Sequence, residues 1–332
     1  MSLSLGQKAG WGLADMGIVV FVIVKQLLIL AFMNSFLGIP IALAGAVTTA
    51  VLIFDIITDP IIGYFSDKTV SRFGRRAPWM LVGAVVLALA MIGLFAVPEN
   101  FTTSASLIWV IVFFLISTLG FTMVSIPYGA MAGEMTLDKK ERSSMTAWRM
   151  AFASLGILVG GALIPILAGD TKSGYTFAAI CVAPLIILSI WFSVFFTRNA
   201  PRTLVPSQQN FSYILKLVLA NRAFVTLVIL YGIMTLAIAL ITAGLPFAAM
   251  YLIMDDGNSL LSGVAKGLGT LSLMFAAFVI GSIISQALWV KLSNLYGKVT
   301  AQLIGIACYI ALLIFIFFSL PNYNVTIIAG LF

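Results

Sequence analysis

Long apolar stretches, separated by short polar breaks, dominate this chain of 332 residues. Hydrophobic residues make up 62% of the chain and charged residues only 9%, and the mean hydropathy is +1.15. Soluble globular chains carry about 25% charged residues, and disordered chains contain far fewer apolar ones. Because roughly 20 apolar residues in a helix are enough to cross a bilayer, the pattern predicts an all-α polytopic membrane protein.

Dividing the apolar stretches at their polar breaks gives nine predicted spans and the start of a tenth. The first stretch is too long for a signal-peptide core and lacks an obvious small-residue cleavage site, so we expect it to be retained as a span. In the fifth span, Gly156, Gly160 and Gly161 predict a close-packing face rather than a phosphate site. The predicted spans are residues 10–33, 40–64, 79–97, 105–127, 145–168, 174–196, 223–252, 262–289 and 299–319, and the tenth begins near Val325.

The distribution of basic residues predicts the orientation of the chain. With the N-terminus in the cytoplasm, the loops on that side hold most of the 18 basic residues, while the outer loops keep only Lys172 and Lys266. Basic residues concentrate in cytoplasmic loops of membrane proteins, so we expect this orientation. The net charge of +7 then reflects membrane topology, and we expect no nucleic-acid partner.

Two loops share the same pattern of basic residues and glycine. Residues 68–75 read KTVSRFGR and residues 291–298 read KLSNLYGK, which is a displacement of 223 residues. The same displacement relates Pro98 to Pro321, where the third and ninth predicted spans end. A repeat of this kind is typical of transporters built from two parallel halves.

The repeat predicts how the chain is divided. We expect an N-terminal six-helix bundle over residues 1–200, a cytoplasmic linker over residues 201–222 and a partial C-terminal bundle over residues 223–332. The second bundle would then be truncated after about its third span, the ninth of the chain, relative to a twelve-span parent.

Two carboxylates lie inside the second predicted span. Asp55 and Asp59 are one helical turn apart, so they project from the same face, and Pro60 follows directly. A charge at membrane depth costs about 2.5 kcal/mol or more, and the two acids repel each other when both are ionised. A cation, a shared proton or a basic side chain from another helix would relieve this, which makes an ion site the first hypothesis. The alternative is that the Asp59–Pro60 step only ends or kinks the helix.

A small-residue turn with a basic cluster lies between the second and third predicted spans. Its glycine permits a close helix approach, and its acid and bases can hold helix ends together in one conformation. The candidate gating residues of this motif are Gly63, Asp67, Lys68, Arg72, Gly74, Arg75 and Arg76.

This loop resembles the signature loop of the major facilitator superfamily. More narrowly, DIITDPIIG at residues 55–63 and SRFGRRAPW at residues 71–79 resemble the glycoside-pentoside-hexuronide cation symporters, the family of the melibiose carriers. The resemblance covers the N-terminal half, and it implies a major facilitator-type fold of two six-helix bundles in a bacterial cytoplasmic (inner) membrane. Supporting motifs are WGLAD at residues 11–15, IPY at residues 126–128 and DKKER at residues 138–142, leading to Arg149.

The resemblance implies roles for individual residues. Asp55 and Asp59 match the acidic pair that ligates the coupling cation, and Thr122 matches a hydroxyl contributed from the fourth span. Carboxylate and hydroxyl oxygens suit Na⁺, and they would also bind H⁺ or Li⁺. Arg149 falls where the family places a sugar-contacting arginine, whose planar group can hold several hydroxyls or one anionic group.

The chain departs from the melibiose carriers at two positions. Those carriers hold galactoside hydroxyls with carboxylates from the first and fourth spans, where this chain has Val19 and Ser125. A galactoside held in that way is therefore not expected, and the cargo is another sugar, a uronide or a non-sugar solute. The candidate substrate-binding residues are Arg149, Ser125, Lys25 and Tyr128.

Lys25 lies deep in the first predicted span. Counted from the cytoplasmic ends of the spans, it lies about 22 Å up and Asp55 only about 13 Å up, so a direct pair would need a bent or shifted helix. Lys25 could snorkel outward, contact the substrate, or replace the coupling cation and uncouple transport.

Asp15 and Arg149 both lie near the cytoplasmic face, where they form either a gate pair or a surface anchor.

These features predict a secondary active transporter that couples a monovalent cation, Na⁺ or H⁺, to a sugar, glycoside or related small organic solute by alternating access. The alternatives are a uniporter or non-sugar carrier in which Lys25 replaces the ion, and a truncated, inactive fragment.

An enzyme is not expected, because the chain has no histidine, no Cys-x-x-Cys and no glycine-rich nucleotide motif. We expect a monomer in the bilayer, no cofactor or metal beyond the transported cation, and two cysteines that are buried apolar residues rather than a disulfide or metal pair.

Overall fold

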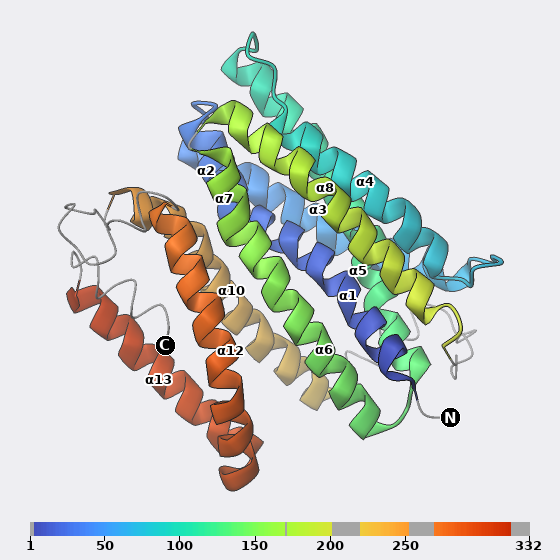
Figure 1. Ribbon diagram of the computed structural model, residues 1–332. Helices are drawn as coiled ribbons and strands as arrows, with labels where there is room; N and C mark the ends of the chain where they lie inside the picture. Colours follow the sequence, from blue (N-terminus) through green and yellow to red (C-terminus); the bar gives the residue numbers. More distant parts are fainter. Residues whose placement is uncertain (1–2, 170, 201–219, 252–268, 320–332) are drawn as a thin grey trace.

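The computed structural model describes residues 3–169, 171–200, 220–251 and 269–319. Within these ranges all regular structure is helical, and the helices lie side by side as long rods (Figure 1). The helices that are long and apolar enough to cross a membrane are Leu5–Ser35, Ile41–Lys68, Ala77–Phe95, Thr103–Met135, Glu141–Ala168 and Lys172–Thr197. The predicted all-α, polytopic membrane fold is confirmed.

Two of these spans contain a short π-helical segment. The first span consists of α1 (Leu5–Ile23), η1 (Val24–Leu28) and α2 (Ile29–Ser35). The next three spans are α3 (Ile41–Lys68), α4 (Ala77–Phe95) and α5 (Thr103–Met135). The fifth span consists of α6 (Lys139–Leu158), η2 (Val159–Leu163) and α7 (Ile164–Ala168), and the sixth is α8 (Lys172–Thr197).

Three helices follow the predicted linker, most of which lies outside the described residues. They are α10 (Arg222–Tyr251), α12 (Thr270–Tyr296) and α13 (Lys298–Ser319). We call these three helices the second half, and the six spans that precede the predicted linker the first half. The predicted tenth span and Pro321 also lie outside the described residues.

The helices of the first half alternate in direction, so the bundle has two distinct ends. We call the end that carries Lys8 and the loops 69–76 and 136–138 the basic end. The opposite end carries the loops 36–40 and 96–102.

The first span occupies the centre of the first half, where α1 packs against α6 and α8. Glycines allow this contact to be close: a Cβ at Gly156 would lie 2.5 Å from the carbonyl oxygen of Met16, and one at Gly160 would lie 3.0 Å from that of Val20. The predicted close-packing face of the fifth span is therefore confirmed. In contrast, α3 packs mainly on α5, and only 22% of its most apolar stretch is buried. The span that carries Asp55 therefore lies at the edge of this half.

The second half meets the first at the two π-helical segments. Figure 1 shows α10, α12 and α13 together on one side of the N-terminal helices. Within this arrangement α10 packs against η1, and α12 packs against η2 and α6. The Ser272 hydroxyl donates a hydrogen bond to the carbonyl oxygen of Ala162 at 3.1 Å, and the Phe275 ring packs on Gly161.

The predicted internal repeat has a counterpart in the backbone. Gly74 and Gly297 both adopt a positive φ, of 91° and 82°, just before a helix begins. A displacement of 223 residues carries the bounds of α4 to within two residues of those of α13. The two loops therefore share a backbone conformation that favours glycine, and not only a sequence pattern.

Several helices are longer than the apolar stretches that predicted them. The fourth predicted span ends at residue 127, whereas α5 continues through Pro127 to Met135, and α3 continues through Pro60 to Lys68. The eighth predicted span, 262–289, begins outside the described residues, and α12 ends only at Tyr296. A helix satisfies its backbone hydrogen bonds internally, so it can continue beyond the apolar zone where side chains become polar. The alternative that the Asp59–Pro60 step ends the helix is wrong.

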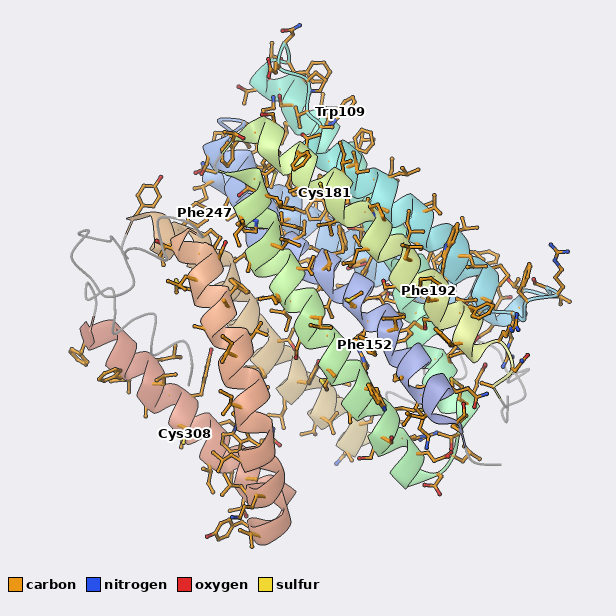
Figure 2. All side chains as sticks on the ribbon, viewed as in Figure 1. Trp109, Phe152, Cys181, Phe192, Phe247 and Cys308 are labelled. Carbon is orange, nitrogen blue, oxygen red and sulfur yellow. The ribbon has the colours of Figure 1, made fainter. Side chains whose placement is uncertain are left out.

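The prediction that both cysteines are buried is also wrong. Both thiols are free and exposed, Cys181 on α8 and Cys308 on α13 (Figure 2). A small apolar thiol suits the outer face of a membrane helix as well as its core, and the apolar sequence around it does not indicate which face it occupies.

Candidate functional site

Asp55 on α3 receives hydrogen bonds from two other spans. The ammonium of Lys25, in η1, lies 2.5 Å from Oδ2 of Asp55, and the Thr122 hydroxyl on α5 donates to Oδ1 at 3.0 Å. The Lys25 side chain is 10% exposed and that of Asp55 16%, so this is a largely buried ion pair. The Lys25 ammonium also lies 5.9 Å from the ring centroid of Phe121.

Asp59 adds a second carboxylate, one turn along α3. Its Oδ1 is buried and has no hydrogen-bond partner among the described residues. The carboxylate lies within electrostatic range of Asp55 and Lys25, and the Thr122 hydroxyl is near it too. We call Lys25, Asp55, Asp59 and Thr122 the ion cluster.

The structure corrects the expected mismatch in height between Lys25 and Asp55. The two spans are joined at the opposite end by the loop 36–40, so depth is better counted from there. At 1.5 Å per residue along each helix, Lys25 lies about 15 Å from Ser35, and Asp55 lies about 21 Å from Ile41. The difference of about 6 Å is the reach of a lysine side chain with its four-carbon stem. Counting from the basic end fails because α1 begins at Leu5 and α3 ends at Lys68, so the two helices extend there by different lengths.

Lys25 is also placed by the π-helical segment that contains it. An extra residue in one turn rotates the two parts of a helix relative to each other by about 100°. The side chain lies on Asp55 rather than in the surrounding lipid, so the snorkelling alternative is wrong for this structure.

A second polar cluster surrounds Arg149 on α6. Its Nε donates to Oδ2 of the buried Asp15 at 3.1 Å, and its guanidinium lies 5.7 Å from the ring centroid of Tyr128. Tyr128 stacks on Trp11 with ring centroids 4.7 Å apart. The Tyr128 hydroxyl and Oδ1 of Asp15 are buried and lack hydrogen-bond partners among the described residues. We call Trp11, Asp15, Tyr128 and Arg149 the arginine cluster; the Asp15–Arg149 pair exists, and its gating role stays a prediction.

The two clusters follow each other along the same helices. Lys25 is ten residues beyond Asp15 in the first span, or about 15 Å, and Thr122 is six residues before Tyr128 on α5, or about 9 Å. Ser125, half-buried on α5, lies at the level between them. Of the candidate substrate-binding residues, Arg149 and Tyr128 therefore lie together, whereas Lys25 belongs to the ion cluster.

Val19 lies at the same intermediate level as Ser125, on α1. A Cβ at Gly156 of α6 would lie 3.0 Å from its Cβ, so Val19 packs closely on the fifth span. The level between the clusters thus has a valine and a serine at the two positions where the melibiose carriers have acids.

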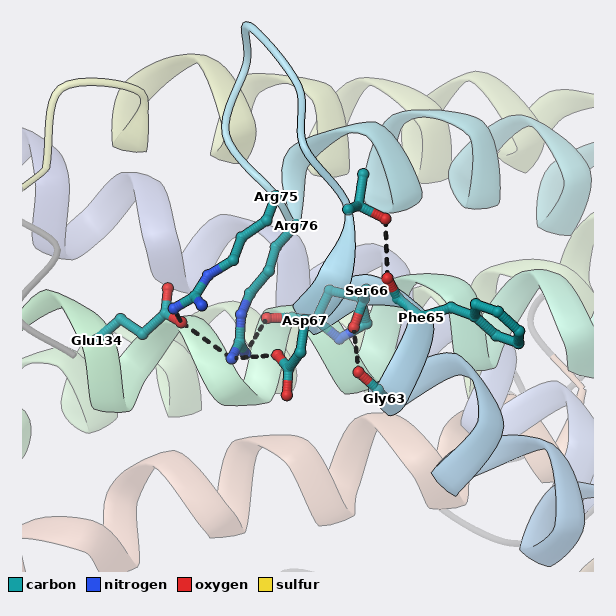
Figure 3. Close-up of polar contacts among 9 residues, drawn as sticks. Gly63, Phe65, Ser66, Asp67, Arg75, Arg76 and Glu134 are labelled. Carbon is teal, nitrogen blue, oxygen red and sulfur yellow. Dashed lines mark hydrogen bonds and ion pairs between the residues drawn. The ribbon is translucent and has the colours of Figure 1, made fainter. Parts of the chain in front are cut away.

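Part of the gating motif forms an ion-pair network at the basic end (Figure 3). The Arg76 guanidinium lies 3.0 Å from Oε1 of Glu134 and 2.9 Å from Oδ1 of Asp67. Arg75 also pairs with Glu134. Because Asp67 is on α3, Arg76 precedes α4 and Glu134 is on α5, the network joins three helix ends. The motif predicted that its acid and bases hold helix ends together, but it did not predict the partner on α5.

The other motif residues lie outside this network. Lys68 contacts a tyrosine of its own helix, Arg72 is exposed, and Gly74 supplies the positive φ of the turn. A Cβ at Gly63 would lie 3.5 Å from Ile126, which is an ordinary van der Waals contact. An added Cβ would therefore fit at Gly63, and the role of this glycine in the motif stays a prediction.

Sequence reasoning assigned no role to Glu134, Trp11 or Glu141. The signal for Glu134 was an acid in the last turn of the fourth span, beside a strongly basic loop. Glu141 accepts hydrogen bonds from the Leu3 amide at 2.7 Å and from the Thr136 hydroxyl at 2.7 Å, so it attaches the N-terminus to the loop 136–138. The WGLAD motif at residues 11–15 contains Trp11, but it does not indicate that the indole ring stacks on Tyr128.

Comparisons with known proteins place the chain in a family. Residues 10–332 match the family described as MFS/sugar transport protein. The chain is 29% identical over 345 residues to the uncharacterized symporter YjmB of Bacillus subtilis, covering 99% of this chain and 71% of that protein. It is 30% identical over 225 residues to the putative glycoside/cation symporter YagG of Escherichia coli, covering 66% of this chain and 48% of that protein.

A solved peptide transporter structure aligns with 88% of this chain and 53% of its own, with a TM-score of 0.47 and 14% identity. The chain thus spans 71% of the Bacillus relative and about half of the other two proteins. The family match covers nearly the whole chain, and the helices described above are those of an integral membrane protein. This protein belongs to the MFS/sugar transport protein family.

Proposed function

We propose that the protein is a secondary transporter that moves a sugar, glycoside or related small organic solute together with a monovalent cation, Na⁺ or H⁺. The ion cluster is the observation that carries this proposal. It brings two carboxylates and a hydroxyl from α3 and α5 together inside the membrane-spanning bundle, and Oδ1 of Asp59 accepts no hydrogen bond from the described residues. Such oxygens are the ligands that a hard monovalent cation prefers.

The arrangement of the two halves supports alternating access. The second half contacts the first at η1 and η2, and η1 carries Lys25 of the ion cluster. A change at the ion cluster can therefore alter the contact between halves, which is what a rocking transporter requires. Both relatives described above carry the word symporter in their names.

The arginine cluster is the proposed site for the cargo. Arg149 presents a planar group with several donors beside the ring of Tyr128, which stacks on Trp11, and two buried oxygens near it lack partners among the described residues. A hydroxyl-rich solute can satisfy such donors and acceptors. With Val19 and Ser125 at the intermediate level, we propose a cargo other than a galactoside held by carboxylates.

Orientation and location follow from the charge pattern. We propose that the basic end faces the cytoplasm of a bacterial cell, in the cytoplasmic membrane, and that the protein acts as a monomer.

Uptake by proteoliposomes tests this function. A panel of labelled sugars, glycosides and uronides is offered with and without an inward Na⁺ or H⁺ gradient, and we expect gradient-driven accumulation of at least one. Asp55→Asn and Asp59→Asn should abolish the dependence on the gradient. Glu99→Gln, which removes an acid from an exposed loop, is the matched control and should behave as wild type. Uptake that survives both aspartate substitutions and ignores both gradients would refute cation coupling.

A further inference from the structure

The position that a cation would take on Asp55 is already filled by a side chain of the protein. Oδ2 of Asp55 accepts from the Lys25 ammonium, and Oδ1 accepts from the Thr122 hydroxyl. A cation that bridges the two carboxylates needs an oxygen from each of them. Asp59 offers its Oδ1, which is unpartnered among the described residues, whereas Oδ2 of Asp55 is held by a positively charged ammonium that repels a second cation.

Charge explains why the lysine lies there. Asp55 and Asp59 together would place two negative charges in a largely buried site, and Lys25 neutralises one of them. Among the described residues, the Phe121 ring lies near the lysine and the Thr122 hydroxyl donates to Asp55, and neither of these groups carries a charge. Since an uncompensated buried charge is strongly unfavourable, the cluster without a bound cation is stabilised by the lysine.

We propose that Lys25 is a tethered competitor of the coupling cation: it occupies Asp55 while the carrier is empty and leaves when the cation binds between Asp55 and Asp59. This inference rests on the proposed function and adds a regulatory residue to the same site. Lys25 sets the cation affinity of the site, because each binding event must first break the Lys25–Asp55 pair.

The position of Lys25 connects this displacement to the rest of the molecule. Lys25 belongs to η1, the segment of the first span against which α10 of the second half packs. When the ammonium leaves Asp55, the segment that contacts the second half loses its attachment to α3. Cation binding is thereby transmitted to the contact between the halves through one side chain.

Na⁺ binding to the purified chain in lipid nanodiscs tests the proposal. The affinity is measured by calorimetry and by the rise in melting temperature with Na⁺ concentration, for wild type, Lys25→Gln and Lys25→Arg. An opposite charge within about 4–6 Å changes the cation affinity of a carboxylate by about tenfold or more, so Lys25→Gln should bind Na⁺ at least about tenfold more tightly than wild type. Lys25→Arg keeps the charge and should bind no more tightly than wild type.

A matched control makes the same chemical change elsewhere. Lys172→Gln removes a lysine at the opposite end, whose ammonium donates to the Pro98 carbonyl, and it should leave the Na⁺ affinity unchanged. If Lys25→Gln unfolds without Na⁺, the Na⁺-dependent rise in its melting temperature still reports its affinity.

Two results separate this inference from the proposed function. If Asp55→Asn and Asp59→Asn remove Na⁺ binding but Lys25→Gln binds Na⁺ no more tightly than wild type, the competitor role is wrong while the cation site stands. If neither aspartate substitution affects Na⁺ binding in wild type or in Lys25→Gln, both the cation site and the competitor are wrong.

Discussion

The carboxylate of Asp55 accepts hydrogen bonds from side chains of two other spans, and this is the central feature at the scale of single residues. An ammonium and a hydroxyl from two other spans satisfy it, whereas its neighbour Asp59 keeps an oxygen free of hydrogen bonds to the described residues. Removing one partner of a buried ion pair is usually strongly destabilising. The side chains of Asp55, Lys25 and Thr122 therefore act as one unit. Replacing any of them changes the binding properties of the other two.

The Thr122 hydroxyl provides a test at this scale. A hydrogen bond of this kind contributes about 0.5–1.5 kcal/mol, so Thr122→Ala should weaken cation binding by roughly 3–10-fold, whereas Thr122→Ser should retain most of the affinity. The measurement is the Na⁺ concentration that gives half-maximal uptake or half-maximal thermal stabilisation.

Thr118 supplies the control for this substitution. It lies one turn away on α5, and its buried hydroxyl has no hydrogen-bond partner among the described residues. Thr118→Ala should therefore leave the cation affinity close to that of wild type. Equal affinities for Thr122→Ala and Thr122→Ser would show that the hydroxyl takes no part in the site.

At the scale of elements, glycines decide how closely the first and fifth spans approach. Glycine faces on α1 and α6 bring the two backbones into contact, and this contact also sets Arg149 beside Asp15. Membrane helices associate largely through such packing, because lipid offers no hydrophobic driving force between them. The arginine cluster therefore depends on residues that carry no functional group.

Gly156 tests this dependence. A Cβ there would lie 2.5 Å from the backbone oxygen of Met16, so Gly156→Ala must push α1 and α6 apart. Overpacking of this kind costs about 1–3 kcal/mol, and we expect a lower melting temperature together with reduced cargo uptake.

Gly129 on α5 is the matched control. A Cβ at Gly129 would have no atom of the described residues within 4 Å, and alanine favours helix more than glycine does. Gly129→Ala should therefore keep or raise the melting temperature. A Gly156→Ala protein as stable as the Gly129→Ala protein would contradict the importance of this contact.

At the scale of the whole molecule, the two halves meet where the first and fifth spans depart from regular α-helix. Helices α10 and α12 pack against η1 and η2, and Ser272 and Ala162 are joined by a hydrogen bond of 3.1 Å. Single-turn π segments occur frequently at functional sites. If the halves rock against each other during transport, these contacts have to change.

A covalent link between the halves tests this movement. Cysteines at Ala162 and Ser272, introduced after the native Cys181 and Cys308 are replaced by serine, should be joined by a short reducible thiol cross-linker. We expect uptake to stop after cross-linking and to return after reduction, because the link holds η2 on α12. Single-cysteine variants treated in the same way should keep their uptake; full uptake by the linked protein would show that this contact does not move.

The network at the basic end shows how much of the site was predictable. The motif of acid, glycine and bases predicted that helix ends are joined there, and Asp67, Arg75 and Arg76 do lie together. Glu134, on which these arginines converge, is 58 residues further along the chain than Arg76, and a loop motif contains no information about so distant a partner. The pairing of Asp15 with Arg149 was one of two alternatives, because both residues lie about one turn from the same end of their spans, and the structure shows the pair.

The membrane fold, the approximate spans and the presence of two acids on one helix face follow from the order of residues along the chain. Apolar length and helical periodicity are local properties, and the bilayer makes them decisive because each span must satisfy its own backbone. Only the tertiary structure decided that Lys25 lies on Asp55, because that contact depends on the π segment and on the level at which two helices pack. Rotation and relative height of packed helices arise from contacts between distant residues, and a single span does not encode them.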